Sequence, residues 1–165
     1  MHAEALDFVS RTLAATGGVG GLRVLEIGSL DVNGTPRGLC DGALCYVGID
    51  RVAGRGVDCV CDAAQYDGAE GYDLVICCEV LEHAPNPCAV IACAERALAP
   101  GGRLILTAAA SERAPHGCDG EAVQVGEHYA GILPDALRTW LADWGDVWIE
   151  HHPTRGDVYA MATRP

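Results

Sequence analysis

The sequence predicts a three-layer α/β domain whose sheet is mostly parallel and ends in a C-terminal antiparallel hairpin. Five apolar runs of strand length recur along the chain, and glycine, acidic or small polar residues follow each of them. The runs are continuous rather than alternating, which is typical of strands covered on both faces and therefore of a parallel sheet. Helical patterns accompany these runs, as a layered α/β arrangement requires. A length of 165 residues suits a single domain over 1–165.

The expected elements begin with a short amphipathic helix over residues 3–15, which the glycines of TGGVGG end. The apolar runs that we expect to form strands follow at 22–27, 44–49, 57–61, 73–78 and 103–107. A second helix is expected over 86–98, and a third begins at Pro134, because proline suits the first helical turn. Finally, DVWIEHH and DVYAMAT flank PTRG, which predicts the antiparallel hairpin.

The connections between the expected elements are uneven in length. Those after the first three strands leave little room for the dozen or so residues that a crossover needs, so we predict a reduced version of the fold. Residues 108–131, in contrast, form a long stretch without a convincing helix or strand pattern. Loops of this length usually serve as lids or binding loops.

The composition narrows the possible functions. The formal net charge is −12 and all eleven cations are arginines, which disfavours sequence-independent binding to nucleic acid. No apolar run approaches the length of a membrane span, and the N-terminus lacks the pattern of a signal peptide, so we expect a soluble, cytoplasmic protein with no membrane partner. The nine cysteines are odd in number and mostly lie in apolar runs, which favours buried free thiols over disulfides.

The end of the first expected strand points to a nucleoside-bearing ligand. Asp50 follows Gly28 by 22 residues, and a carboxylate roughly 20 residues after such a glycine typically binds ribose hydroxyls. The glycines fall only at Gly28 and Gly34, and Asp31 would repel a phosphate, so the loop suits a ligand with a cationic end. Glu26 lies within a buried strand, where we expect a ligand or an arginine to neutralise its charge.

At this point the sequence resembles a known family. VLEIGSLDVNG, YVGID, CDAA, YDLVICCEVLEHAPNP and LAPGGRLILT occur in the order and spacing of class I S-adenosylmethionine-dependent methyltransferases, particularly those of small molecules. The resemblance covers residues 22–107. It implies a Rossmann-like fold, S-adenosyl-L-methionine as the cofactor and S-adenosyl-L-homocysteine as the product. The loop GSLDVNG differs from the usual G-x-G-x-G pattern, although Asn33 and Gly34 can still form a tight turn.

The resemblance also implies a set of cofactor-binding residues. Asp50 would bind both ribose hydroxyls, Asp62 would face the adenine amino group, and Glu26 would line the methionine part. Cys78 and Glu79 would close the pocket. The full set is Glu26, Gly28, Ser29, Leu30, Asn33, Gly34, Asp50, Arg51, Asp62, Ala63, Cys78 and Glu79.

Few catalytic side chains are expected, because the sulfonium group itself carries the reactivity. His83 directly follows the fourth expected strand and is the first candidate for a base that assists a hydroxyl or amine acceptor. The resemblance adds His128, which precedes the last helix together with Tyr129. Glu79 completes the set of catalytic candidates.

No metal site is expected from the sequence. Cys59 and Cys61 lack the spacing of a zinc site. His116, Cys118 and Asp119 lie close together in the long stretch, but we interpret them as a loop tip that faces solvent.

Three functions remain open on the sequence. The leading one is methyl transfer to an oxygen or nitrogen of a small molecule or sugar. The alternatives are a nucleobase or nucleic-acid methyltransferase, and a non-catalytic module that keeps the cofactor fold for assembly. The thin helical layer would also leave room for a partner subunit, so a homodimer is compatible with the sequence.

Overall fold

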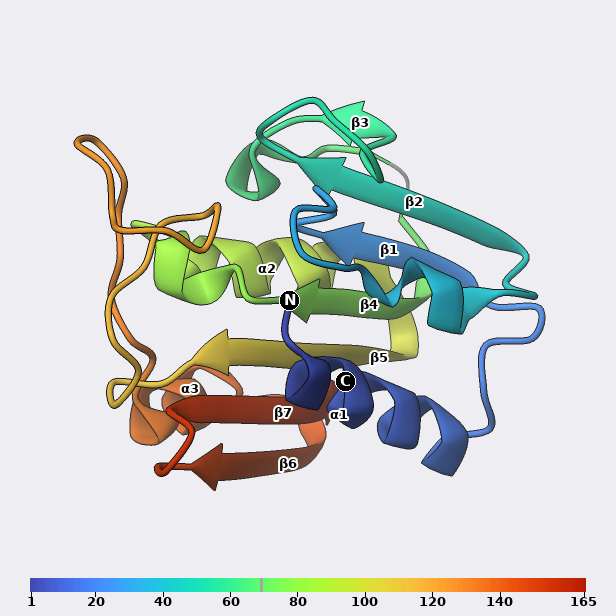
Figure 1. Cartoon of the computed structure of the whole chain (residues 1–165). Helices are drawn as coiled ribbons and strands as arrows, with labels where there is room; N and C mark the ends of the chain where they lie inside the picture. Colours follow the sequence, from blue (N-terminus) through green and yellow to red (C-terminus); the bar gives the residue numbers. More distant parts are fainter. Residues whose placement is uncertain (69) are drawn as a thin grey trace.

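The computed structural model describes residues 1–68 and 70–165, and a mixed seven-stranded sheet runs through its centre (Figure 1). The strand order is β3-β2-β1-β4-β5-β7-β6. The first five strands in this order are parallel, whereas β7 pairs antiparallel to both β5 and β6. The strands are β1 (Arg23–Ile27), β2 (Cys45–Asp50), β3 (Cys59–Val60), β4 (Tyr72–Cys78), β5 (Leu98–Ala109), β6 (Gly145–His152) and β7 (Asp157–Thr163).

Helices cover both faces of the sheet, α1 on one face and α2 and α3 on the other (Figure 1). The α-helices are α1 (Ala3–Ala15), α2 (Pro87–Ala97) and α3 (Pro134–Trp140), and the short 3-10 helices are η1 (Pro36–Cys40), η2 (Ala63–Gln65) and η3 (Leu81–His83). Short 3-10 helices thus occupy positions at which a larger member of this fold class has crossover helices. The predicted fold class, including its reduced helical layer and its C-terminal hairpin, is confirmed.

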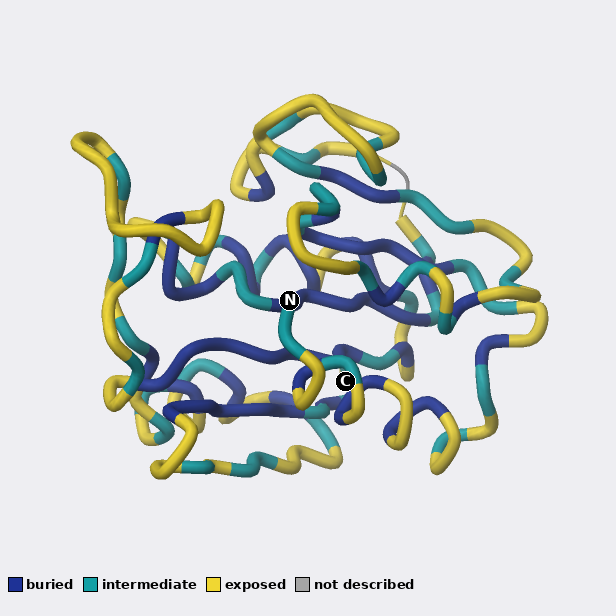
Figure 2. The backbone as a smooth tube through the Cα atoms, in the orientation of Figure 1, coloured by how far each residue is buried: buried dark blue, intermediate teal, exposed yellow. Residues whose placement is uncertain are grey.

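The central strands are buried on both faces, as their continuous apolar runs predict (Figure 2). In β4, Leu74 and Ile76 pack in the cluster that contains Phe8 of α1. Val75 and Cys77 point to the opposite cluster, which also contains residues of α2 and α3. Since successive side chains of a strand alternate between faces, one strand contributes to both hydrophobic cores.

Two strands, β3 and β5, differ in length from the prediction by more than one residue. The third strand has only two residues, Cys59–Val60, because it pairs with no more than the end of β2. The fifth begins at Leu98 rather than at residue 103, since Leu98 already pairs with Tyr72 before a register shift at Tyr72/Leu74. The APGG segment, residues 99–102, therefore lies within β5.

The cysteines are free thiols, but fewer of them are buried than predicted. All nine lie in the described ranges, and none of them is paired in a disulfide. The buried ones are Cys40, Cys77, Cys78 and Cys93, whereas Cys45, Cys59, Cys88 and Cys118 are exposed. Among the described residues, no helix combines the length and the apolar character that crossing a membrane requires.

Candidate active site at the carboxyl edge of the sheet

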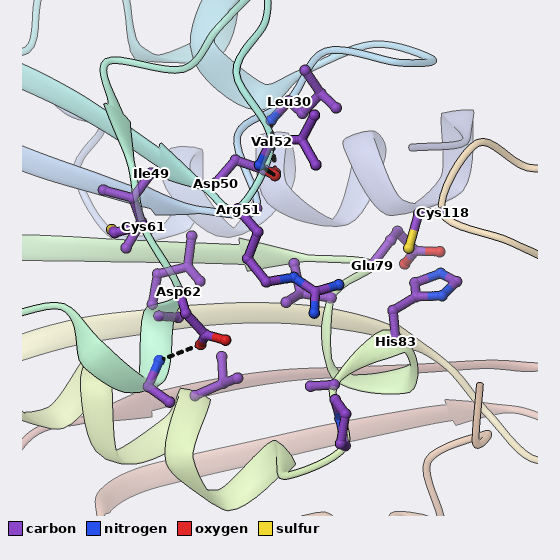
Figure 3. Close-up of a pocket in the computed structure, with 18 of the residues that line it drawn as sticks. Leu30, Ile49, Asp50, Arg51, Val52, Cys61, Asp62, Glu79, His83 and Cys118 are labelled. Carbon is purple, nitrogen blue, oxygen red and sulfur yellow. Dashed lines mark hydrogen bonds between the residues drawn. The ribbon is translucent and has the colours of Figure 1, made fainter. Parts of the chain in front are cut away.

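A cavity of about 320 Å³ opens where the parallel strands β1 to β4 end (Figure 3). Its walls are mostly apolar, and most of its charged groups come from the segments that follow β2, β3 and β4. Asp50 and Arg51 extend from the end of β2, Asp62 follows β3, and Glu79 and His83 follow β4 (Figure 3). Carboxyl ends of neighbouring parallel strands lie at one sheet edge, which brings these residues together although they are distant in sequence.

The turn after β1 exposes its backbone to the cavity. Gly28 lies on the cavity wall and has a φ of +79°, a conformation that glycine adopts without strain. A Cβ atom at this position would lie 2.1 Å from Cγ2 of Val80. The Gly28 amide donates a hydrogen bond to the Ile49 carbonyl oxygen at 2.9 Å, which holds the turn against β2. Only glycine therefore fits where this turn meets the segment after β4.

Asp50 ties together the two loops that flank the cavity. Its carboxylate accepts hydrogen bonds from the Leu30 amide at 3.1 Å and the Val52 amide at 2.9 Å. The carboxylate remains on the cavity wall (Figure 3), and each of its oxygens has lone pairs left for further donors. The side chain is thus oriented by the protein and can still accept hydrogen bonds from two hydroxyl groups of a ligand.

The far end of the cavity suits a flat, mostly apolar group with a polar rim. Asp62 caps η2 by accepting a hydrogen bond from the Ala64 amide at 2.8 Å. Ala63 and Ile49 supply apolar surface next to this carboxylate, and Val90 of α2 adds more. A ligand that combines a ring system with an exocyclic amino group would match this wall.

A second cavity, of about 280 Å³, adjoins the first. The two share one wall, which is formed by Leu30, Val32, Glu79, His83 and Cys118. The second cavity is the more polar of the two, since His2, Asn33, Arg113 and His116 also line it. Two different molecules could therefore meet at the shared wall.

Glu79 is held rigidly at this shared wall. It is one of two non-glycine residues with positive φ in the described chain, at +56°, a strained conformation that often marks functional sites. Its carboxylate accepts hydrogen bonds from Thr107 Oγ1 at 2.9 Å and from Arg113 at 2.9 Å. Burial opposes ionisation, but the contacts with His2 and Arg113 outweigh it and lower the pKa of Glu79. The residue is therefore a carboxylate at neutral pH.

Glu82 and His83 follow immediately in η3, and both are buried. Glu82 Oε1 accepts a hydrogen bond from the Ala109 amide at 3.0 Å. Burial, together with the charge of Glu79, raises the pKa of Glu82 to about 8. The His83 ring contacts the rings of His116 and Tyr129, with centroids 5.2 and 5.6 Å away. Burial and the neighbouring His116 lower the pKa of His83, so its ring is neutral at pH 7.

Comparison with known proteins agrees with this geometry. The profile of a methyltransferase domain family matches residues 1–156. The chain belongs to this methyltransferase domain family. A curated relative, the ubiquinone biosynthesis O-methyltransferase of Xanthomonas oryzae, is 47% identical over 45 residues, which are 27% of this chain and 18% of the relative. The matched region thus spans less than a fifth of that protein.

Solved structures share the fold with this methyltransferase domain. The N-methyltransferase NodS from Bradyrhizobium japonicum, in complex with S-adenosylhomocysteine, is 19% identical, with a TM-score of 0.68 over 98% of this chain and 86% of that one. The 1,6-didemethyltoxoflavin N1-methyltransferase of Burkholderia thailandensis is 17% identical, with a TM-score of 0.70 over 97% and 78% of the two chains. At these identities the likeness establishes the fold, as predicted from the sequence.

The predicted site residues of the methyltransferase domain divide into three groups. Seven predicted cofactor-binding residues line the first cavity, namely Gly28, Leu30, Asp50, Arg51, Asp62, Ala63 and Glu79. Asn33 and Cys78 line the second cavity instead, and His83 and Glu79 lie in the wall between the two. Four predicted residues, Glu26, Ser29, Gly34 and His128, line neither cavity.

Glu26 differs most from its prediction. It is 2% exposed and hydrogen-bonded to Tyr46 Oη at 2.8 Å and Thr35 Oγ1 at 3.2 Å. Two hydroxyl groups therefore hold this carboxyl group in place, and no arginine forms a salt bridge with it among the described residues. Burial raises the pKa of Glu26 to about 7. The strand pattern did not indicate these partners, because they come from β2 and from the residue before η1. The contact of Glu26 with the methionine part of a cofactor stays a prediction.

The long loop contains the residues that sequence reasoning missed. His116 is half-buried against His83 in the second cavity, so its assignment to a solvent-facing loop tip was wrong. Arg113 contacts both Glu79 and the buried Asp157. His128, in contrast, is exposed. The only available signal was the prediction that residues 108–131 act as a lid or binding loop, which did not indicate which of its side chains turn inward.

Proposed function

We propose that residues 1–165 form one domain that transfers a methyl group from S-adenosylmethionine to an oxygen or nitrogen atom of a small molecule. The observation that carries this proposal is the pair of adjoining cavities with a common wall at Glu79 and His83. The first cavity has the groups that an adenosyl cofactor needs, and the second offers space for an acceptor. Alignment of two bound reactants accounts for much of the catalysis of a transfer reaction.

The residues of the first cavity fit S-adenosylmethionine. Asp50 can bind the two ribose hydroxyls, while Asp62 and the apolar surface around Ala63 match the adenine ring and its amino group. The positive φ of Gly28 lets the methionine part approach the backbone closely. Carboxylates near the cavity disfavour a phosphate-bearing cofactor and favour a cationic one. When bound, the cofactor supplies the electrophilic methyl group on its sulfonium.

The chain's own contribution is to position the acceptor and exclude water. His83 lies in the shared wall, and its buried Nδ1 atom has no hydrogen-bond partner among the described residues. Glu79 is fixed beside it by Arg113 and Thr107. An acceptor hydroxyl or amine bound in the second cavity would thus face the methyl group across this wall.

The size and charge of the site favour a small acceptor. A cavity of about 280 Å³ is near the lower end of the range for small-molecule sites, roughly 300–1,000 Å³. The net charge of −12 opposes a nucleic-acid backbone, and Arg113 is already paired with carboxylates. In support of this assignment, two structurally similar methyltransferases are named for small molecules, 1,6-didemethyltoxoflavin and magnesium protoporphyrin IX.

Two measurements test the proposal. Calorimetry should detect stoichiometric binding of S-adenosylmethionine, and a methyl-labelled cofactor should label at least one compound of a metabolite panel. The absence of cofactor binding would refute the proposal, whereas binding without any transfer, also in cell extract, would indicate the non-catalytic alternative. Cytoplasmic location and homodimer formation stay predictions, which fractionation and sedimentation would test.

A further inference from the structure

Three potential metal ligands converge behind the wall of the second cavity. Glu82, His83 and His116 each direct one ligand atom to the same place, and these atoms all lie within 4.8 Å of one another. A point equidistant from three atoms at that separation lies about 2.8 Å from each. An inward shift of about 0.7 Å would therefore give the ~2.1 Å bonds of a metal held by imidazole and carboxylate. Side-chain rotation alone can supply such a shift.

The same place holds several buried polar atoms that lack partners. Five buried side-chain atoms have no hydrogen-bond partner within residues 1–68 and 70–165. Three of them are Glu82 Oε2, His83 Nδ1 and Tyr129 Oη, all from the cluster around His83. An unsatisfied buried carboxylate oxygen is costly, by about 1–3 kcal/mol or more. Their concentration in one place indicates a missing binding partner rather than random packing defects.

The surrounding backbone orients these side chains as it does in metal centres. His116 Nδ1 lies within hydrogen-bond distance of the Ala114 carbonyl oxygen, at 3.1 Å. Glu82 uses its other oxygen to accept the Ala109 amide hydrogen bond. Metal-binding histidines usually engage the second ring nitrogen in such a contact, which fixes the ring and leaves the first nitrogen free.

From this arrangement we propose that Glu82, His83 and His116 bind one divalent transition-metal ion. Two imidazoles and one carboxylate suit ions such as Mn²⁺, Fe²⁺, Co²⁺ or Zn²⁺, whereas Mg²⁺ and Ca²⁺ prefer oxygen ligands alone. His83 and His116 line the second cavity, so the remaining coordination positions of the ion face that cavity. An oxygen-bearing molecule bound there could complete the coordination.

A bound cation would also account for the presence of the buried Glu82 close to another glutamate, Glu79, in the chain. Glu79 is neutralised by Arg113, but no such cation contacts Glu82 in the described chain. A divalent ion would supply a positive charge beside this buried carboxyl group, where an ionised carboxylate without a cation is unfavourable. Metal binding is independent of the proposed methyl transfer, since it requires neither cofactor nor acceptor. It also departs from our expectation of no metal site.

The proposal is tested by titrating the protein with Mn²⁺. The amount of bound Mn²⁺ is measured as the loss of the electron paramagnetic resonance signal of the free ion. The full chain is titrated without cofactor in a large excess of Mg²⁺, which occupies non-specific acidic sites. Mn²⁺ is chosen because it has little affinity for the exposed thiols, which would bind Zn²⁺. The variants are Glu82→Gln, which retains the side-chain shape, and His116→Ala in the surface loop. His151→Ala, at an exposed histidine outside the cluster, is the matched control.

We expect one bound Mn²⁺ per chain, with the affinity at least tenfold weaker in both cluster variants and unchanged in the control. Thermal melts of the metal-free variants establish that each is folded, and the loop variant His116→Ala keeps the test valid if Glu82→Gln is unstable. The proposal is overturned if the wild-type chain does not retain Mn²⁺ against Mg²⁺. Equal binding by the wild type and His116→Ala would also overturn it.

Discussion

Replacement of Glu26 by glutamine should make the protein more stable at alkaline pH. Glu26 is 2% exposed, and its carboxyl group contacts only the hydroxyls of Tyr46 and Thr35 among the described residues. Burial, opposed in part by these two hydrogen bonds, raises its pKa from the ordinary 4.5 to about 7. Glutamine has nearly the same shape and cannot ionise, so the variant removes the charge and keeps the packing.

The expected magnitude follows from the two pKa values. The folded state holds the Glu26 proton up to about pH 7, whereas the unfolded chain releases it near pH 4.5. Between these values the folded state binds more protons, so the free energy of unfolding falls as the pH rises. A tenfold difference in proton affinity is about 1.4 kcal/mol, which gives a total loss of about 3 kcal/mol above pH 7. Glu26→Gln should abolish this loss.

Urea unfolding of both proteins without cofactor, at several pH values between about 4 and 8, measures the effect. The difference in the free energy of unfolding between variant and wild type should be near zero or unfavourable at pH 4. This difference should rise through pH 5 to 7 and level off at about 1–3 kcal/mol in favour of the variant. The plateau can lie below the full value of about 3 kcal/mol because the glutamine amide matches the hydrogen bonds of this site less well than the carboxyl group does. Titrations common to both proteins cancel in this difference. The same replacement at the exposed Glu95 of α2 is the control.

A difference that does not depend on pH would refute this reasoning about Glu26. A variant that loses stability relative to wild type as the pH rises would refute it more strongly. The first result would mean that the carboxyl group ionises in the folded protein as easily as in the unfolded chain, and the second that it ionises more easily.

Three further perturbations test the site. Asp50→Ala should weaken the binding of S-adenosylmethionine, measured by calorimetry, more than tenfold without unfolding the protein, because two charge-assisted hydrogen bonds are lost. Unchanged affinity would contradict the ribose-binding role of Asp50. Gly28→Ala should lower the free energy of unfolding in urea by about 1–3 kcal/mol, because φ of this residue is +79° and the new Cβ would clash with Val80. A variant as stable as the wild type would show that the turn is not constrained. Arg113→Met should cost about 3 kcal/mol or more, since it removes the nearest cation from the buried Asp157. A loss below about 1 kcal/mol would show that the remaining partners are sufficient, namely the Tyr159 hydroxyl at 2.7 Å, His2 at 3.7 Å and Arg155 at 3.9 Å.

The prediction of the first cavity depended on features that are local in sequence. Gly28, Asp50 and Asp62 each end or follow an apolar run, and all three line one cavity in the structure. The inference needed only the positions of the strands and the rule that parallel strands present their carboxyl ends at one edge. Errors in strand length, as for β3 and β5, did not matter because the ends that face the cavity were placed correctly.

The second cavity could not be predicted in this way. Its distinctive residues, Arg113 and His116, belong to a long loop whose path no periodic pattern specifies. His116 and His128 lie in the same loop and were indistinguishable by residue type, yet the first packs against His83 and the second is exposed. Loop conformation is decided by contacts with the rest of the molecule, not by local propensity.

The sequence by itself therefore determined the order of strands and helices, the parallel character of the sheet, and the meeting of Asp50 with Asp62. These properties follow from hydrophobic runs and from chirality, which act over short stretches of chain. Only the tertiary structure decided that two hydroxyls satisfy Glu26 and that the loop returns His116 to Glu82 and His83. The physical reason is that a buried polar group must find its partners in space, and those partners come from segments that are far apart in the sequence.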